Sequence, residues 1–240
     1  MYIKKIYDMG WVIDVEKHYP GNYGAPGMKR QPKRKRTPEE IEKQNQKNKE
    51  KKLQRIILTN FKKGDWHLTL KYRPRDRPEG WEEAKKQVRR FLNKMRAAYK
   101  KAGIPFKWIM ITEKGKKGQV LHHHLIIEDI TKELNTVKLV KELWTHGNTW
   151  WVDLYEEGEY KNLAEYIVKK ETKEEDGWCS YSRSRNLKKP KERKKTIRRK
   201  RWSKEPKPKK GFYIIKDSVV NGINPVTGYP YQHYSMRRLD

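Results

Sequence analysis

The sequence predicts an α+β domain, an antiparallel sheet with helices on one side, flanked by basic extensions. Three observations lead to this prediction. Residues 66–72, WHLTLKY, alternate between apolar and polar side chains, which is typical of a half-buried strand. Residues 79–103 instead space their apolar side chains as a helix does. Residues 106–113 and 119–127 are two more strand-like segments, joined by the glycine-lysine turn KGKKG, which predicts a hairpin.

The remaining elements follow in an order that favours α+β. A helix is expected from Thr37, because Pro38 suits the first helical position and Glu40 completes a capping box. Gly103 is expected to end the helix over 79–103. The order strand, helix, hairpin, helix, strand, helix indicates one antiparallel sheet. The later elements are expected at residues 137–144 (helix), 149–154 (strand), 158 to about 173 (helix) and 211–220 (strand).

Shifts in composition divide the chain into four parts. Residues 1–36 are rich in glycine, proline and tyrosine and end with six basic residues in eight, so we expect a poorly ordered basic arm. Residues 37–187 hold the folded domain, including the first helix. Residues 188–210 carry 14 basic residues in 23, and residues 211–240 form a C-terminal strand and tail.

The charge of the chain indicates a polyanionic partner. Lys and Arg number 59 against 30 Asp and Glu, a formal charge of +29, so nucleic acid is the expected partner. No run approaches the roughly 18 apolar residues of a spanning helix, and the N-terminus lacks a signal-peptide core, so no membrane partner is expected. The single cysteine, Cys179, excludes an internal disulfide framework and a multi-cysteine zinc site, which suits a reducing cytoplasm.

The basic tract at residues 188–210 has two readings. It either binds phosphates, with Trp202 stacking on a base, or is a solvated linker, and composition favours neither. The side chains that we expect to contact DNA are Lys170, Arg183, Arg185, Arg198, Arg199, Arg201 and Trp202.

Three consecutive histidines in LHHHLII are the first candidate for chemistry. In a strand, His122 and His124 share one face while His123 lies on the other face among apolar neighbours, where it is expected only to pack. The pair could chelate a cation, although histidines in strands are often merely hydrogen-bonded. If the hairpin loop has an even number of residues, Glu113 falls beside the pair. Two imidazoles and one carboxylate with open positions suit a catalytic divalent ion.

A metal ion beside nucleic acid suggests phosphodiester chemistry, which still needs a nucleophile. In the helix EYKNLAEYIVKK, Tyr160 falls in the apolar stripe, whereas Tyr166 lies at its edge beside lysines. A phenol has a pKa near ~10, so nearby cations are needed to favour the phenolate. The alternative is that Tyr166 is an ordinary interfacial tyrosine.

Taken together, DWHLTLKY, LHHHLII and AEYIVKK resemble, in order, the three motifs of the HUH endonucleases. This superfamily comprises replication initiators, relaxases and transposases that nick single-stranded DNA. The closest similarity is to small rolling-circle replication initiators (Rep proteins) of bacterial plasmids, phages and integrated elements. It covers roughly residues 60–190, and NFKKGDWHLTLKY and YSRSRNLKKP add to it.

The resemblance implies a ferredoxin-like sheet and specific roles for residues of this chain. His122 and His124 would bind a divalent ion, usually Mg²⁺ or Mn²⁺, with Glu113 as the best match for the acidic third ligand. Tyr166 would be the nucleophile, and Lys169 matches the lysine that follows it in the family. His123 departs from the bulky hydrophobic residue that the family usually has, and the Lys169–Lys170 doublet leaves open which lysine acts.

The expected function is therefore nicking and rejoining of single-stranded origin DNA through a 5′-phosphotyrosyl intermediate, initiating rolling-circle replication in the cytoplasm of a bacterial host. No phosphate-binding P-loop occurs in the sequence, so a host helicase is the expected partner. One alternative with the same chemistry is a single-tyrosine transposase or relaxase. Another, of a different class, is a non-catalytic basic nucleic-acid-binding protein.

Overall fold

The chain is described by a computed structural model over residues 1–20, 32, 35–115, 120–130, 132, 134–154, 157–168 and 181–239. It divides into two compact units. The terminal unit comprises Met1–Thr59 and Lys189–Asp240, and the central unit comprises Asn60–Lys188. The first and last residues of the central unit exchange two hydrogen bonds of 2.8 Å between the Asn60 side chain and the Lys188 backbone, which fix both ends of its chain together.

The central unit is an α+β fold built on one antiparallel sheet, as predicted. The strand order is β6-β3-β5-β4-β7, so β5 lies between β3 and β4 and the connectivity is ferredoxin-like. Its elements are β3 (Trp66–Leu70), a 3-10 turn (Pro74–Asp76), α2 (Trp81–Lys101), β4 (Trp108–Lys114), β5 (Leu121–Ile127), α3 (Thr136–Leu143), β6 (Thr149–Asp153), a 3-10 turn (Glu157–Tyr160), α4 (Lys161–Val168) and β7 (Ser182–Arg183).

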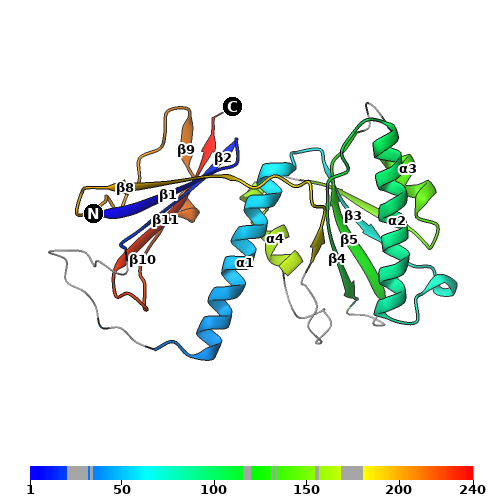
Figure 1. Ribbon diagram of the computed structural model, residues 1–240, viewed down its shortest axis with the longest axis horizontal. Helices are drawn as coiled ribbons and strands as arrows, with labels where there is room; N and C mark the ends of the chain where they lie inside the picture. Colours follow the sequence, from blue (N-terminus) through cyan, green and yellow to red (C-terminus); the bar gives the residue numbers. More distant parts are fainter. Residues whose placement is uncertain are drawn as a thin grey trace. The chain divides into compact units, whose positions relative to one another are not determined.

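One face of this sheet packs against α2 and α3 (Figure 1). The apolar stripe expected at helical spacing is buried along α2, where it meets alternate residues of the strands and Trp144. Gly103, with φ +74°, follows the helix and adopts the left-handed conformation that glycine tolerates best. The fully buried side chains of this core include Leu68, Leu70, Met95, Tyr99, Leu125, Ile127 and Trp144.

The opposite face of the sheet is covered in part by α4 (Figure 1), which differs from the expectation that all helices lie on one side. The apolar stripe of α4 is correctly predicted: Tyr160, Ala164 and Ile167 are buried. This stripe needs an apolar surface, and the face that bears Ile109, Ile111 and Ile126 supplies one because the other face is already occupied by α2 and α3. The predicted extension of the helix to about residue 173 lies outside the described residues after Val168.

The terminal unit contains a second sheet where the sequence suggested extensions. Residues 1–20 are not an arm: they form two strands, which pair with strands from near the other end of the chain in the order β10-β11-β2-β1-β8, with β9 beside β11. This pairing satisfies the backbone of segments whose own composition is too polar to indicate strands. The elements are β1 (Tyr2–Asp8), β2 (Val12–His18), α1 (Pro38–Asn60), β8 (Lys191–Ile197), β9 (Phe212–Ile214), a 3-10 turn (Lys216–Ser218), β10 (Val220–Ile223) and β11 (Pro230–Arg238).

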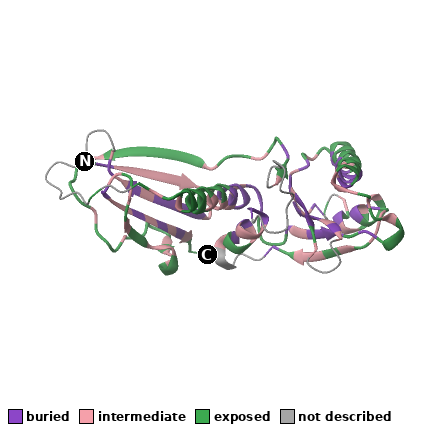
Figure 2. Cartoon of the chain, turned by 90° about the horizontal axis from the view of Figure 1, so that it is seen from below, coloured by how far each residue is buried: buried purple, intermediate pink, exposed green. Residues whose placement is uncertain are grey.

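The basic tract is also structured in part. Its first half is the edge strand β8, paired along its length with β1 and exposed from Lys191 to Thr196 (Figure 2). Trp202 does not project as a free stacking platform: its ring stacks on Tyr19 at 4.9 Å and meets the edge of Tyr2 at 5.0 Å. The expectation that Trp202 stacks on a base therefore conflicts with its place in an aromatic cluster.

Helix α1 begins with the predicted capping box. The Glu40 backbone donates to the Thr37 hydroxyl at 3.3 Å, and the Thr37 backbone donates to the Glu40 carboxylate at 3.2 Å. The first half of the helix is exposed and its last turns are buried (Figure 2). Nearly all of this helix belongs to the terminal unit, not to the domain of residues 37–187 expected from composition, because Arg55 binds strand β2. None of the helices in the described part of the chain combines the length and apolar character needed to cross a bilayer.

Candidate active site

The face of the central sheet that α4 covers holds a group of three potential metal ligands. Glu113 on β4 lies directly opposite His122 on β5, as the hairpin register predicted. The Glu113 Oε1 atom lies 3.2 Å from Nε2 of His122 and 3.3 Å from Nε2 of His124. One ligand atom from each residue falls within 4.8 Å of the others. This group could hold a metal ion.

The second nitrogen of each imidazole is engaged in a way that leaves Nε2 facing Glu113. Nδ1 of His122 lies 3.2 Å from the Val120 carbonyl, and Nδ1 of His124 lies 3.0 Å from the Thr69 hydroxyl. A partner at Nδ1 fixes the ring orientation and, by holding the proton there, frees the Nε2 lone pair for a cation. The donor set, two imidazoles and one carboxylate with open positions, therefore fits a divalent ion.

His123 belongs to the core, as predicted from strand alternation. Its side chain is fully buried on the α2 face, where Nε2 lies 2.7 Å from the Tyr72 hydroxyl and Nδ1 lies 2.7 Å from the Thr112 hydroxyl. Burial, with a smaller contribution from neighbouring imidazoles, lowers the pKa of His123 to about 3. His123 is thus a neutral, hydrogen-bonded core residue on the opposite face from the three ligand candidates.

Tyr166 of α4 lies directly on the ligand group. Its hydroxyl donates to Oε1 of Glu113 and lies 2.7 Å from Nε2 of His124, with the ring at right angles to the imidazole. Burial first, and then the hydrogen bond and negative charge of Glu113, raise the pKa of Tyr166 above its ordinary value. Without a cation beside it, this phenol remains protonated.

The other predicted site residues are spread over the chain. Lys169 and Lys170 lie outside the described residues, which end in α4 at Val168. Arg183 is exposed in β7, opposite Ile109 of β4, and Arg185 follows it. Both belong to the central unit, whereas Arg198, Arg199, Arg201 and Trp202 belong to the terminal unit.

Several side chains around the ligand group were not singled out from the sequence. A pocket of about 630 Å³ adjoins it, lined by His122, His124 and Tyr166 and also by Lys71, Arg77 and Trp150. His67 lies on the same face, its ring centre 5.4 Å from that of His124. Burial, followed by the neighbouring His124, lowers the pKa of His67 to about 4. Strand alternation from Trp66 already placed His67 and Thr69 on one face, so their place was predictable once the site strand was known.

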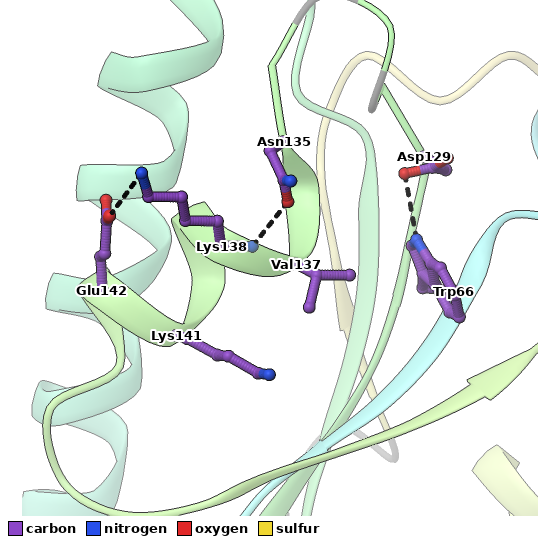
Figure 3. Close-up of a pocket in the computed structure, with 7 residues that line it drawn as sticks. All are labelled: Trp66, Asp129, Asn135, Val137, Lys138, Lys141 and Glu142. Carbon is purple, nitrogen blue, oxygen red and sulfur yellow. Dashed lines mark hydrogen bonds and ion pairs between the residues drawn. The ribbon is translucent and has the colours of Figure 1, made fainter.

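A second pocket, of about 720 Å³, lies on the α2 and α3 side of the sheet and does not share this chemistry. The Trp66 indole donates to Asp129 at 3.0 Å, and the side chain of Asn135 caps α3 by accepting from the Lys138 backbone at 2.9 Å (Figure 3). Lys138 pairs with Glu142 at 3.9 Å. These polar groups serve one another, and the pocket brings no histidine or cysteine to its wall.

Comparison with known proteins agrees with this site. The searches of curated proteins and of solved structures found no match. Residues 65–175 match the protein-family model described as replication-associated protein ORF2. The matched segment contains β3, the ligand group and Tyr166. The family suggests DNA binding, replication initiation and nuclease activity, and it is consistent with a rolling-circle Rep protein. Residues 65–175 are therefore a replication-associated domain of the ORF2 family.

Proposed function

We propose that the chain is an HUH-type endonuclease that nicks and rejoins single-stranded DNA at a replication origin through Tyr166. The observation that supports this most is the position of the Tyr166 hydroxyl, which donates to Glu113 and lies 2.7 Å from His124, two of the three candidate metal ligands. A nucleophile and a cation site that share one scissile phosphate must lie this close together. A tyrosine that only packed at the helix edge would have no need of two such partners.

The chemistry follows from this geometry. Attack by the Tyr166 oxygen on phosphorus forms a Tyr–O–P bond and breaks the bond from phosphorus to the 3′ oxygen of the preceding nucleotide. The phenol gives up its proton, and the departing oxygen takes up a proton to become a free 3′ hydroxyl that can prime synthesis. The phosphotyrosyl ester retains the energy of the broken bond, so the reverse attack rejoins the strand without a further energy source.

A divalent ion such as Mg²⁺ or Mn²⁺, when held by Glu113, His122 and His124, would polarise a phosphoryl oxygen and favour the phenolate. The residues of the chain do the positioning: Thr69 and Val120 orient the imidazoles, and α4 holds Tyr166 over them. Lys169, which follows Tyr166 by three positions, is the proposed contact to the scissile phosphate.

Labelled single-stranded DNA from the genetic element that encodes the chain tests this proposal. A 5′-phosphotyrosyl linkage keeps the downstream fragment, so a 3′-end label should migrate with the protein under denaturing conditions while a 5′-end label is released. Chelation of divalent ions should abolish the adduct, and adding Mn²⁺ should restore it. Release of both labels without any adduct would indicate hydrolysis by water and would refute a tyrosine nucleophile.

A further inference from the structure

Trp150 is exposed next to the candidate active site. Its exposed fraction is 64%, whereas no other tryptophan in the described part of the chain is classed as exposed. The neighbouring Trp151 points to the opposite face of β6, where it packs edge-on against Trp66 at 5.4 Å. A large aromatic ring left in solvent beside a functional pocket marks an interaction site more often than a structural one.

The strand register aligns Trp150 with the ligand group. Trp150 pairs with Thr69 of β3, and Thr69 pairs with His124 of β5, so the three residues form one row across neighbouring strands. Two strand spacings separate Trp150 from His124, about 10 Å. A strand of DNA whose phosphate lies at Tyr166 therefore has a base within reach of Trp150.

Positive charge surrounds the ring. The Lys71 Nζ atom lies 6.0 Å from the Trp150 ring centre, and the exposed Arg77 lines the same pocket. No carboxylate is among the described residues that line this pocket. An aromatic platform flanked by cations and free of acidic side chains is the arrangement that binds single-stranded nucleic acid, with bases stacked on the rings and phosphates on the basic groups.

The backbone beneath Lys71 and Trp150 is held in place. The Lys71 carbonyl accepts a hydrogen bond of 3.1 Å from the buried Trp144 indole, and the Lys71 amide donates to the Asn148 carbonyl at 2.9 Å. At Gly147 a Cβ atom would come within 2.1 Å of the Lys71 carbonyl oxygen, so only glycine permits this approach. The platform is therefore preorganised by the fold.

We propose that Trp150, with Lys71 and Arg77, forms a subsite that binds an unpaired base and its phosphates close to the scissile phosphate. The subsite selects single-stranded over duplex DNA, because the face of a base is accessible to an indole only when that base is unstacked. This inference rests on the proposed function, since it assumes that DNA reaches Tyr166.

The test measures binding apart from nicking. Affinity for a single-stranded oligonucleotide is determined by fluorescence anisotropy in the full-length Tyr166→Phe protein, which cannot form the adduct. Adding Trp150→Ala should weaken binding about 10- to 100-fold, because base–aromatic stacking contributes roughly 1–3 kcal/mol per base. Trp150→Phe should recover most of the affinity. A 2-aminopurine base scanned along the strand should be quenched at one position, and Trp150→Ala should abolish that quenching.

Tyr213→Ala is the matched control, because Tyr213 is also an exposed aromatic residue, 43% exposed, but lies on β9 of the terminal unit. It should leave the quenching intact. Unchanged affinity and quenching in Trp150→Ala would overturn the subsite, even if the Tyr166 adduct forms normally in the otherwise native chain. Conversely, a chain that forms no adduct but loses affinity in Trp150→Ala would refute the proposed nicking and leave base stacking supported.

Discussion

The Thr69 hydroxyl lies 3.0 Å from Nδ1 of His124, on the side of the ring opposite Glu113 and Tyr166. Thr69 comes from β3 and His124 from β5, and the two residues are direct partners in the sheet. The orientation of one candidate metal ligand thus depends on a side chain more than fifty residues earlier in the chain.

Replacing Thr69 by valine should therefore weaken metal binding while preserving the shape of the side chain. We expect the Mn²⁺ affinity, measured by titration calorimetry, to fall about 10- to 100-fold, as is typical when the partner of a ligating histidine is removed. Thr112→Val is the control, since the Thr112 hydroxyl contacts Nδ1 of the core residue His123 at 2.7 Å. It should cost stability but little metal affinity. Equal losses of Mn²⁺ affinity in both variants would contradict the assignment.

The buried His123 should make folding stability depend on pH. Its pKa is lowered to about 3 in the folded protein, against about 6.5 in an unfolded chain. Between these pH values the unfolded chain binds a proton that the folded protein does not, so the contribution of His123 is fully present above about pH 6.5 and declines as the pH falls toward 3. In His123→Gln this dependence should disappear.

Urea unfolding of both proteins from pH 7.5 to pH 4.5 measures this effect. The difference in free energy of unfolding between the native chain and His123→Gln should shrink as the pH falls. Groups common to both proteins, such as Asp65, cancel in that difference. A difference that stays constant with pH would mean that His123 is not held neutral by the fold.

The structure also changes how the basic tract should be tested. Deleting residues 188–210 would remove β8, the partner of β1, so a loss of DNA binding could simply reflect damage to the terminal sheet. Substituting Lys191, Arg193, Lys194 and Lys195 with glutamine keeps the strand pairing. For each phosphate that these side chains no longer neutralise, the log–log salt dependence of single-stranded DNA binding should become shallower by about 0.7.

The matched control neutralises Arg89, Arg90, Lys94 and Lys100, four exposed basic residues of α2, on the far side of the central sheet from Tyr166. The terminal unit carries 31 basic against 11 acidic residues, a formal charge of +20, and the central unit 28 against 19, +9. We therefore expect the β8 substitutions to have the larger effect. An unchanged salt slope would show that β8 is a solvated edge strand.

The parts of the site that could be predicted from the sequence depend on local periodicity. The alternation of LHHHLII assigns His122 and His124 to one face, and a short hairpin with an even loop brings Glu113 beside them. The helical stripe around Tyr160 likewise separates the buried tyrosine from Tyr166 at its edge. In each case the relevant neighbours are close in sequence, or are connected by a single turn.

The terminal sheet could not be predicted in the same way. Strand β1 pairs with β8, and β2 pairs with β11, across separations of nearly 190 residues or more. Strand β8 is stabilised by backbone hydrogen bonds to β1 while its lysines and arginine remain exposed, so its composition is the same as that of a solvated tract. Trp150 was overlooked for a related reason: its role depends on the row that it forms with Thr69 and His124, which requires the strand order.

The account depends most on the identity of the nucleophile. The adduct formed on single-stranded DNA with Mn²⁺ can be trapped, digested and mapped by mass spectrometry to the modified peptide. We predict a nucleotide on Tyr166, no adduct in Tyr166→Phe, and normal adduct formation in Tyr160→Phe, because Tyr160 is buried in the apolar stripe and only 3% exposed. A nucleotide on Tyr160 or on any other tyrosine would contradict the account, even if the chain proved to be a metal-dependent nuclease.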